Sequence, residues 1–202
     1  MALNSNALTS VANLKFQLNI LTSDNTQNTM LELYINAASQ AIETYCDRKF
    51  KIPSSSYVEY HDGGGMDYIL PRQYPVTEIT DIRIDQERVF GTDTIVDATE
   101  YEAADEGQTI TSDRIFPTGR QNVRLTYKAG YDPVPADIEL ACLWTAEWFY
   151  RQRARGDMGR TSVSKGDESV GVLAELPKQV LQLIEQYKRT EAPATNSPVR
   201  NR

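Results

Sequence analysis

Few residues of this chain could carry acid–base, nucleophilic or metal chemistry. The 202 residues include one histidine, His61, and two cysteines, Cys46 and Cys142. A structural zinc site takes about four His or Cys ligands. The three such residues of this chain are too few to form one within a single copy. Both cysteines lie in apolar helical patterns, and we interpret them as reduced core residues. A disulfide bridge between them would require their helices to touch.

His61 is the only histidine that could act as the base of a Ser-His-Asp or Cys-His site. It is followed by Asp62 and by three glycines at 63–65, which predict a turn. A turn of this kind holds an acid–base pair too loosely for catalysis, which argues against a hydrolase that uses His61. We therefore predict no catalytic, cofactor or metal site, and a protein that is not an enzyme.

The charge of the chain is acidic but uneven. The net charge is −7, which argues against a general nucleic-acid binder, because such proteins need many Lys and Arg side chains to contact phosphates. Residues 59–113 alone contain fourteen acidic side chains and three arginines. This acidic stretch is typical of solvated sheet faces and loops. It could equally form a surface that repels DNA or meets a basic partner.

Apolar residues at helical spacing predict a bundle of three to four helices. In the second predicted helix Leu31, Ile35, Ala38, Ile42 and Tyr45 form one stripe. The predicted helices cover residues 9–20, 28–48, 135–154 and 177–188.

The third predicted helix is apolar almost all round, so it must be covered on more than one side. Its own chain or a neighbouring subunit could provide that cover. The candidates for subunit contacts are Leu140, Leu143, Trp144, Trp148 and Tyr150.

The middle of the chain, residues 57–128, has the alternating pattern of strands. Ile82 and Ile84 alternate with charged side chains, and Val123 and Leu125 alternate with Arg124 and Thr126. We predict an antiparallel or sandwich-like β insert between the two long helices. The expected fold is α+β and mainly α, with one domain at 1–187.

Basic residues gather at two places near the end of the chain. Arg151, Arg153 and Arg155 follow the apolar helix, where they could complement its dipole or contact an acidic neighbour. The tail from residue 188 to 202 has a net charge of +3 and little to bury, so we expect it to be flexible and disordered in isolation. The N-terminus lacks the pattern of a signal peptide, and we expect no membrane span.

Several matching stretches occur in a fixed order between about residues 8 and 187. They are Tyr45 with Arg48, Tyr74-Pro75-Val76, Tyr127 with Gly130-Tyr131, Pro135, and an aromatic helix that ends in arginine. In this order the chain resembles the head–tail connector proteins of long-tailed bacteriophages and related gene-transfer particles, which are also called adaptor or head-completion proteins. The chain departs from the shortest members in its longer acidic insert and its basic tail.

The resemblance implies a structural protein of the virion neck that is made in the host cytoplasm. Roughly twelve copies would form a ring under the portal protein, extend the DNA channel and support a stopper or tail-completion protein. DNA would pass through without specific binding. The alternative that the acidic insert supports is a DNA mimic or regulatory module that acts on a nucleic-acid enzyme.

Two sets of charged residues are candidates for contacts in such a ring. The portal-docking candidates are Arg151, Arg153, Arg155, Lys188, Arg189, Arg200 and Arg202. The acidic candidates for the channel or a partner are Asp81, Asp85, Glu87, Glu102, Asp105 and Glu106.

Overall fold

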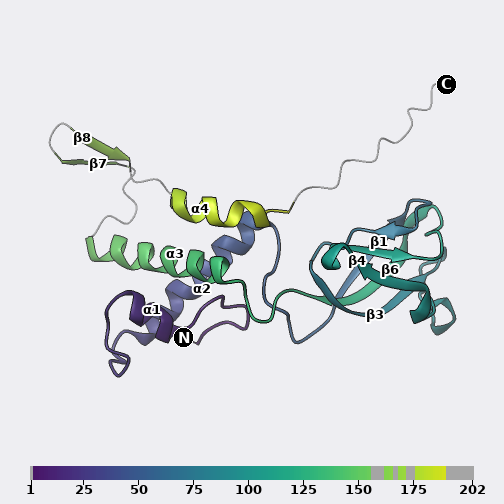
Figure 1. The fold of residues 1–202 in the computed structure, drawn as a ribbon, viewed down its shortest axis with the longest axis horizontal. Coiled ribbons are helices and arrows are strands. Elements are labelled where there is room, and N and C mark those ends of the chain that lie inside the picture. Colours follow the sequence, from purple (N-terminus) through teal and green to yellow (C-terminus); the bar gives the residue numbers. More distant parts are fainter. Residues whose placement is uncertain (1, 156–161, 166–167, 172–175, 190–202) are drawn as a thin grey trace.

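The structure is a computed structural model that describes residues 2–155, 162–165, 168–171 and 176–189. The described chain is elongated, with a helical lobe at one end and a lobe of β-strands at the other (Figure 1). Each lobe has its own hydrophobic core. The strands come from the middle of the sequence, so the chain leaves the helical lobe after one long helix and returns to it before the other.

The helical lobe is built around two long antiparallel helices and two short ones. In order, the α-helices that the structure describes are α1 (Val11–Gln17), α2 (Asn28–Cys46), α3 (Ala136–Arg155) and α4 (Lys178–Ile184). A 3₁₀ turn, Glu185–Tyr187, follows α4. A small antiparallel hairpin, β7 (Ser162–Lys165) with β8 (Glu168–Gly171), lies in the sequence between α3 and α4.

Apolar spacing explains the contact between α2 and α3. The side chains of Leu31, Ile35, Ala38 and Ile42 are fully buried along one row of α2. They share the core of the helical lobe with Ile138, Ala141, Cys142 and Ala146, which recur at three- and four-residue spacing along α3. Tyr45, the last member of the predicted stripe, is only half-buried.

Local signals fix two helix ends. The hydroxyl of Ser10 accepts a hydrogen bond from the backbone N–H of Asn13 at 3.1 Å and caps α1. Asp47 adopts a left-handed conformation with φ 50°, and its N–H bonds to carbonyls of the last turn of α2. This turn directs the next residue, Arg48, toward the β lobe.

The β lobe consists of two three-stranded antiparallel sheets that share one core. The first has the order β1–β6–β3, with β1 at Tyr57–Gly63, β6 at Gly119–Ala129 and β3 at Val76–Ile84. The second has the order β2–β5–β4, with β2 at Tyr68–Ile69, β5 at Thr109–Ser112 and β4 at Tyr101–Ala104. Three 3₁₀ turns lie between β3 and β5, at Thr92–Thr94, Ala98–Glu100 and Asp105–Gly107.

The alternation of β6 shows why this segment forms a sheet. Val123, Leu125 and Tyr127 point into the core, and Arg124 and Thr126 point away from it. Ile110 of β5 and Ile69 of β2 contribute to the same core from the other sheet. Burial from both sheets gives the lobe the double layer that a sheet with one apolar face requires.

The prediction that the fold is mainly α is wrong. The described residues form four α-helices and two three-stranded antiparallel sheets, so the fold is α+β with a substantial sheet component. The alternating pattern indicated strands, but it did not show that the acidic segment contributes a whole second sheet. That sheet uses short strands of two to four residues, whose pairing depends on contacts distant in the sequence.

Candidate assembly surfaces and the joint between the lobes

His61 belongs to a hydrogen-bonded cluster inside the first sheet. Its Nε2 lies 3.0 Å from a carboxylate oxygen of Glu59, and the other oxygen of Glu59 accepts a 2.6 Å bond from the hydroxyl of Tyr127. The backbone N–H of Arg72 also donates to Glu59 at 3.0 Å. Burial raises the pKa of Glu59, but these hydrogen bonds outweigh it and hold the pKa below its ordinary value. The cluster fastens β1 and the segment between β2 and β3 to β6.

The two cysteines are free thiols in the core of the helical lobe. Burial raises the pKa of Cys46 to about 11 and that of Cys142 to about 12. The sulfur of Cys142 lies 3.5 Å from the hydroxyl of Ser39. Within the described residues, no group of three or more His, Cys, Asp and Glu side chains could hold a metal ion.

The candidates for subunit contacts on α3 are all half-buried, but they do not share one environment. Leu143, Trp144 and Tyr150 pack against the helical core, and the Tyr150 hydroxyl donates to Gln27 at 3.1 Å. Trp144 and Trp148 line an open groove of about 480 Å³ between α3 and the start of α4. The remaining candidate, Leu140, is half-buried near the start of α3.

The basic candidates lie at opposite ends of the helical lobe. Arg151 and Arg153 are exposed near the end of α3, away from the β lobe, and Arg151 forms a 2.6 Å ion pair with Glu147 (Figure 1). The backbone of Arg155 ends the same helix.

The basic residues after α4 lie at the other end, beside the end of α2. The ammonium of Lys188 lies 5.1 Å from the ring centre of Tyr45. The backbone N–H of Arg189 donates to the carbonyl of Cys46, and its guanidinium pairs with Asp47 at 3.3 Å. Arg200 and Arg202 lie outside the described residues.

The acidic candidates divide into a paired group and an exposed group. Asp81 lies between two arginines of the first sheet, Arg83 at 3.2 Å and Arg124 at 3.7 Å. The carboxylate of Asp85 accepts backbone N–H bonds at 2.8 Å from the loop that follows it, and these bonds lower its pKa. Glu87 is exposed in that loop.

The exposed group lies on β4 and in the turn that joins it to β5. Glu102, Asp105 and Glu106 are all exposed, and none pairs with a cation of the described chain. Asp105 and Glu106 have φ values of 50° and 55°, so two consecutive acidic residues adopt the left-handed conformation. Three of the six acidic candidates thus lie within residues 102–106, without an ion-pair partner among the described residues.

A cluster around Arg48 joins the two lobes. The residue patterns of the sequence did not predict this role for Arg48. The Arg48 side chain is buried, and its guanidinium lies 3.7 Å from the ring centre of Tyr74. It also lies 5.2 Å from the ring of Phe50 and 5.6 Å from that of Tyr131, and it donates to the Tyr74 carbonyl. Tyr74 comes from the segment before β3, whereas Phe50 belongs to the helical core.

Backbone hydrogen bonds complete this joint. The N–H of Gly130 donates to the carbonyl of Pro75, and the N–H of Tyr131 donates to that of Phe50. Gly130 has φ 131°, and a Cβ there would lie within 2.9 Å of the backbone of residues 50–52. Only glycine therefore allows the segment that leaves the β lobe to approach the segment that enters it so closely.

Comparison with protein families gives the decisive observation. The sequence model of the family described as "Head completion protein" matches residues 7–190, which is most of the chain. The chain belongs to this head completion protein family. The match includes both lobes and the joint between them.

Solved structures show the same fold. A chain from the "Neck of empty GTA particle computed with C6 symmetry" is 18% identical with a TM-score of 0.62, and the alignment covers 96% of both chains. A chain from the "Neck of native GTA particle computed with C12 symmetry" is 20% identical with a TM-score of 0.61, over 96% of this chain and 98% of that one. A third is from the "Virion of native gene transfer agent (GTA) particle". The comparison with curated proteins gave no match.

Membership of the head completion family confirms the predicted function as a structural head-completion protein of the virion. The alternative, an acidic DNA mimic or regulatory module, is not supported. A structural family is also in keeping with the prediction that the chain is not an enzyme. Within the part of the head completion protein that the structure describes, no helix is long and apolar enough to cross a membrane.

Proposed function

We propose that about twelve copies of the chain form a ring between the portal protein and the next neck protein, a stopper or tail-completion protein. The observation that supports this is the shared two-lobe fold: 96% of the chain aligns with a chain from a neck of C12 symmetry. A closed ring needs two different contact surfaces on each copy, because head-to-tail contacts join unlike faces. The groove beside Trp144 and Trp148 is one candidate surface for such contacts.

The acidic segment formed by β4 and the turn that follows it is suited to a position that faces DNA. Its exposed carboxylates, Glu102, Asp105 and Glu106, offer no cations to phosphates, so DNA would slide past without being held. In this proposal the β lobe contributes to the channel. Charge reversal to lysine at these three positions would create phosphate contacts and slow DNA release from particles. Charge reversal of Asp81, which pairs with Arg83 and Arg124, should instead disturb the sheet. This variant shows what a folding defect looks like in the same assay.

The basic residues serve the contact with the portal protein. Arg189 is fixed at the joint by its contacts with Cys46 and Asp47, so the tail from residue 190 starts from a defined place. The α3 arginines lie at the far end of a helix of twenty residues, about 30 Å away along its axis. One compact patch on the portal therefore cannot take both sets from the same copy, and we assign the portal contact first to the tail.

Two measurements test the proposal. The native mass of the purified chain, alone and mixed with the portal of its own particle, should show a complex of about twelve copies in at least one of the two states. Deletion of residues 193–202 should abolish portal binding and leave the helical and β lobes folded, as circular dichroism would show. If the chain stays monomeric both alone and with the portal, the proposal of a ring is wrong. Normal portal assembly after the deletion overturns the role of the tail.

A further inference from the structure

The helical lobe exposes two large apolar side chains beside α1. Phe16 at the end of α1 is 82% exposed, and Leu21 in the following loop is 76% exposed. We call these two residues the knob. Other apolar residues of the same segment, Leu14 and Leu18, pack into the core, so the exposure is specific to the knob. Side chains of this size each contribute strongly when they become buried in a contact.

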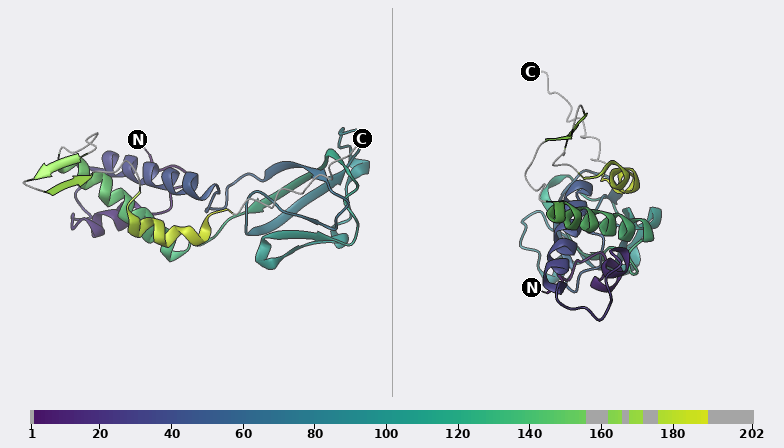
Figure 2. Two further views of the ribbon diagram at one scale, coloured as in Figure 1. Left: turned by 90° about the horizontal axis from the view of Figure 1, so that it is seen from above. Right: turned by 90° about the vertical axis from the view of Figure 1, so that its left-hand side faces the viewer.

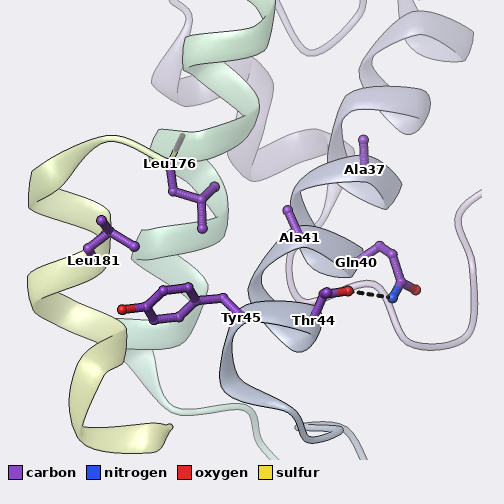
Figure 3. A pocket seen from close by; sticks show the side chains of 7 residues that line it. All are labelled: Ala37, Gln40, Ala41, Thr44, Tyr45, Leu176 and Leu181. Atoms are coloured by element: carbon purple, nitrogen blue, oxygen red, sulfur yellow. Dashed lines mark hydrogen bonds between the residues drawn. The ribbon is translucent and has the colours of Figure 1, made fainter. Parts of the chain in front are cut away.

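A second face of the lobe has an apolar groove that nothing in the described chain fills. It lies between α2 and α4 and has a volume of about 810 Å³ (Figure 3). One wall contains Ala37, Ala41 and Tyr45 of α2, at four-residue spacing, with the polar Gln40 and Thr44 beside them, and the other contains Leu176 and Leu181. The small alanine side chains leave the space, and the leucines and the tyrosine ring make its walls apolar.

The knob and the groove lie on opposite sides of the lobe. In Figure 1 and in the right view of Figure 2, α1 and its loop lie on one side of α3 and α4 lies on the other. A knob on one face and a groove on the opposite face are what a head-to-tail contact requires. Repetition of such a contact produces a closed ring when the rotation between copies is suitable.

Charges beside the two features are complementary. Asp24 lies in the same tight turn as Leu21, and its N–H donates to the Leu21 carbonyl. Among the described residues its carboxylate accepts hydrogen bonds from Thr26 and lies near the charge of Lys15, with which it forms no ion pair. Lys178 is exposed in the first turn of α4, between the groove residues Leu176 and Leu181. It has no ion-pair partner among the residues that the structure describes.

We propose that the knob of one copy docks into the α2–α4 groove of the next copy, with Asp24 beside the Lys178 of that copy. The occupant is thus a second copy of this chain. The contact rests on the ring proposed above and identifies two surfaces that form it. It also uses α4, whose other flank borders the groove beside Trp148.

Mixing of two variants tests the contact. Leu21→Asp puts a charge in place of one of the two apolar side chains of the knob, and Ala37→Arg fills the groove. Both positions are exposed, so each variant should fold. Neither variant should form rings under the conditions in which the wild type does. A one-to-one mixture should form dimers but no rings, because each pair has one intact knob and one intact groove. Ser55→Arg, an exposed position outside both features, is the matched control and should form rings.

Charge reversal is the second measurement. Asp24→Lys and Lys178→Asp should each raise the concentration needed for half-assembly about fivefold, the range of an exposed ion pair. The chain with both changes should assemble within about twofold of the wild type, because the pair is restored between neighbours. A double variant that is as impaired as either single variant contradicts the pairing.

The outcomes separate this contact from the ring itself. If the wild type forms no ring alone or on its portal, the proposed function is wrong and the contact fails with it. If the wild type forms rings and either single apolar variant does so equally well, the ring stands and the knob-and-groove contact is wrong. Single variants that block assembly while their mixture stays monomeric also overturn it, since the two features then meet different surfaces.

Discussion

The joint around Arg48 allows a quantitative prediction for Arg48→Met. Methionine keeps most of the apolar stem but removes the guanidinium that stacks on Tyr74 at 3.7 Å. A desolvated cation–π contact is worth about 2 kcal/mol. The bond from a charged donor to the Tyr74 carbonyl is worth roughly another 2 kcal/mol.

Part of this loss is offset. The Nε of Arg48 is buried without a hydrogen-bond partner, and its removal relieves a desolvation cost of about 1–3 kcal/mol. We therefore expect a net loss of about 2 kcal/mol in the free energy of unfolding. The matched control is Arg72→Met, because Arg72 also pairs across the joint, with Asp47 at 3.6 Å, but is 62% exposed. An exposed pair of this kind contributes under about 1 kcal/mol.

Urea unfolding followed by two probes measures the effect. Both tryptophans lie on α3, so fluorescence reports on the helical lobe, whereas far-UV circular dichroism reports on both lobes. Arg48→Met should lower the urea midpoint and separate the two transitions, because the lobes have separate cores and lose a contact between them. Coincident transitions with a stability equal to that of Arg72→Met would show that Arg48 does not couple the lobes.

Three further predictions concern single sites. Because the folded pKa of Glu59 is lowered, its stabilisation is present above its ordinary pKa of 4.5 and lost as pH falls through the lower folded value. Glu59→Gln should therefore destabilise the chain at neutral pH. The difference in stability between the variant and the wild type should be smaller in acid, as urea midpoints at both pH values would show. Cys46 and Cys142 should resist a thiol reagent near neutral pH until the chain is unfolded, because burial raises both pKa values. Gly130→Ala should cost at least about 1–3 kcal/mol in thermal or urea unfolding, since its Cβ would meet the backbone of residues 50–52.

Helical periodicity predicted the core of the helical lobe but not its outer face. The row from Leu31 to Ile42 is fully buried, because a contact between helices selects residues on one side of each helix. The groove row at Ala37, Ala41 and Tyr45 has the same spacing, yet alanines in a helix are also expected from propensity alone. Sequence cannot separate the two reasons, and the position of α4 beside this row was needed to show a groove.

The β lobe was underestimated because alternation describes one strand at a time. It says which residues of β6 point inward, but it does not say how many other strands pair with it or stack on it. Charge counting had a similar limit. Asp81 and Glu59 were counted in the acidic stretch, yet both make internal bonds, whereas Glu102 and Glu106 remain exposed. Pairing depends on neighbours distant in the chain, which a local count does not include.

The residues that carried the resemblance are explained by one place in the structure. Arg48, Tyr74 and Gly130-Tyr131 are scattered over more than eighty positions of the sequence, but they meet at the joint between the lobes. A buried cation stacked on Tyr74 and a glycine pressed against residues 50–52 fix how the two lobes are oriented. In a ring, that orientation decides where each β lobe lies once the helical lobes are in contact. A weak sequence pattern can therefore identify this family, because the pattern describes the joint that sets how the two lobes are oriented.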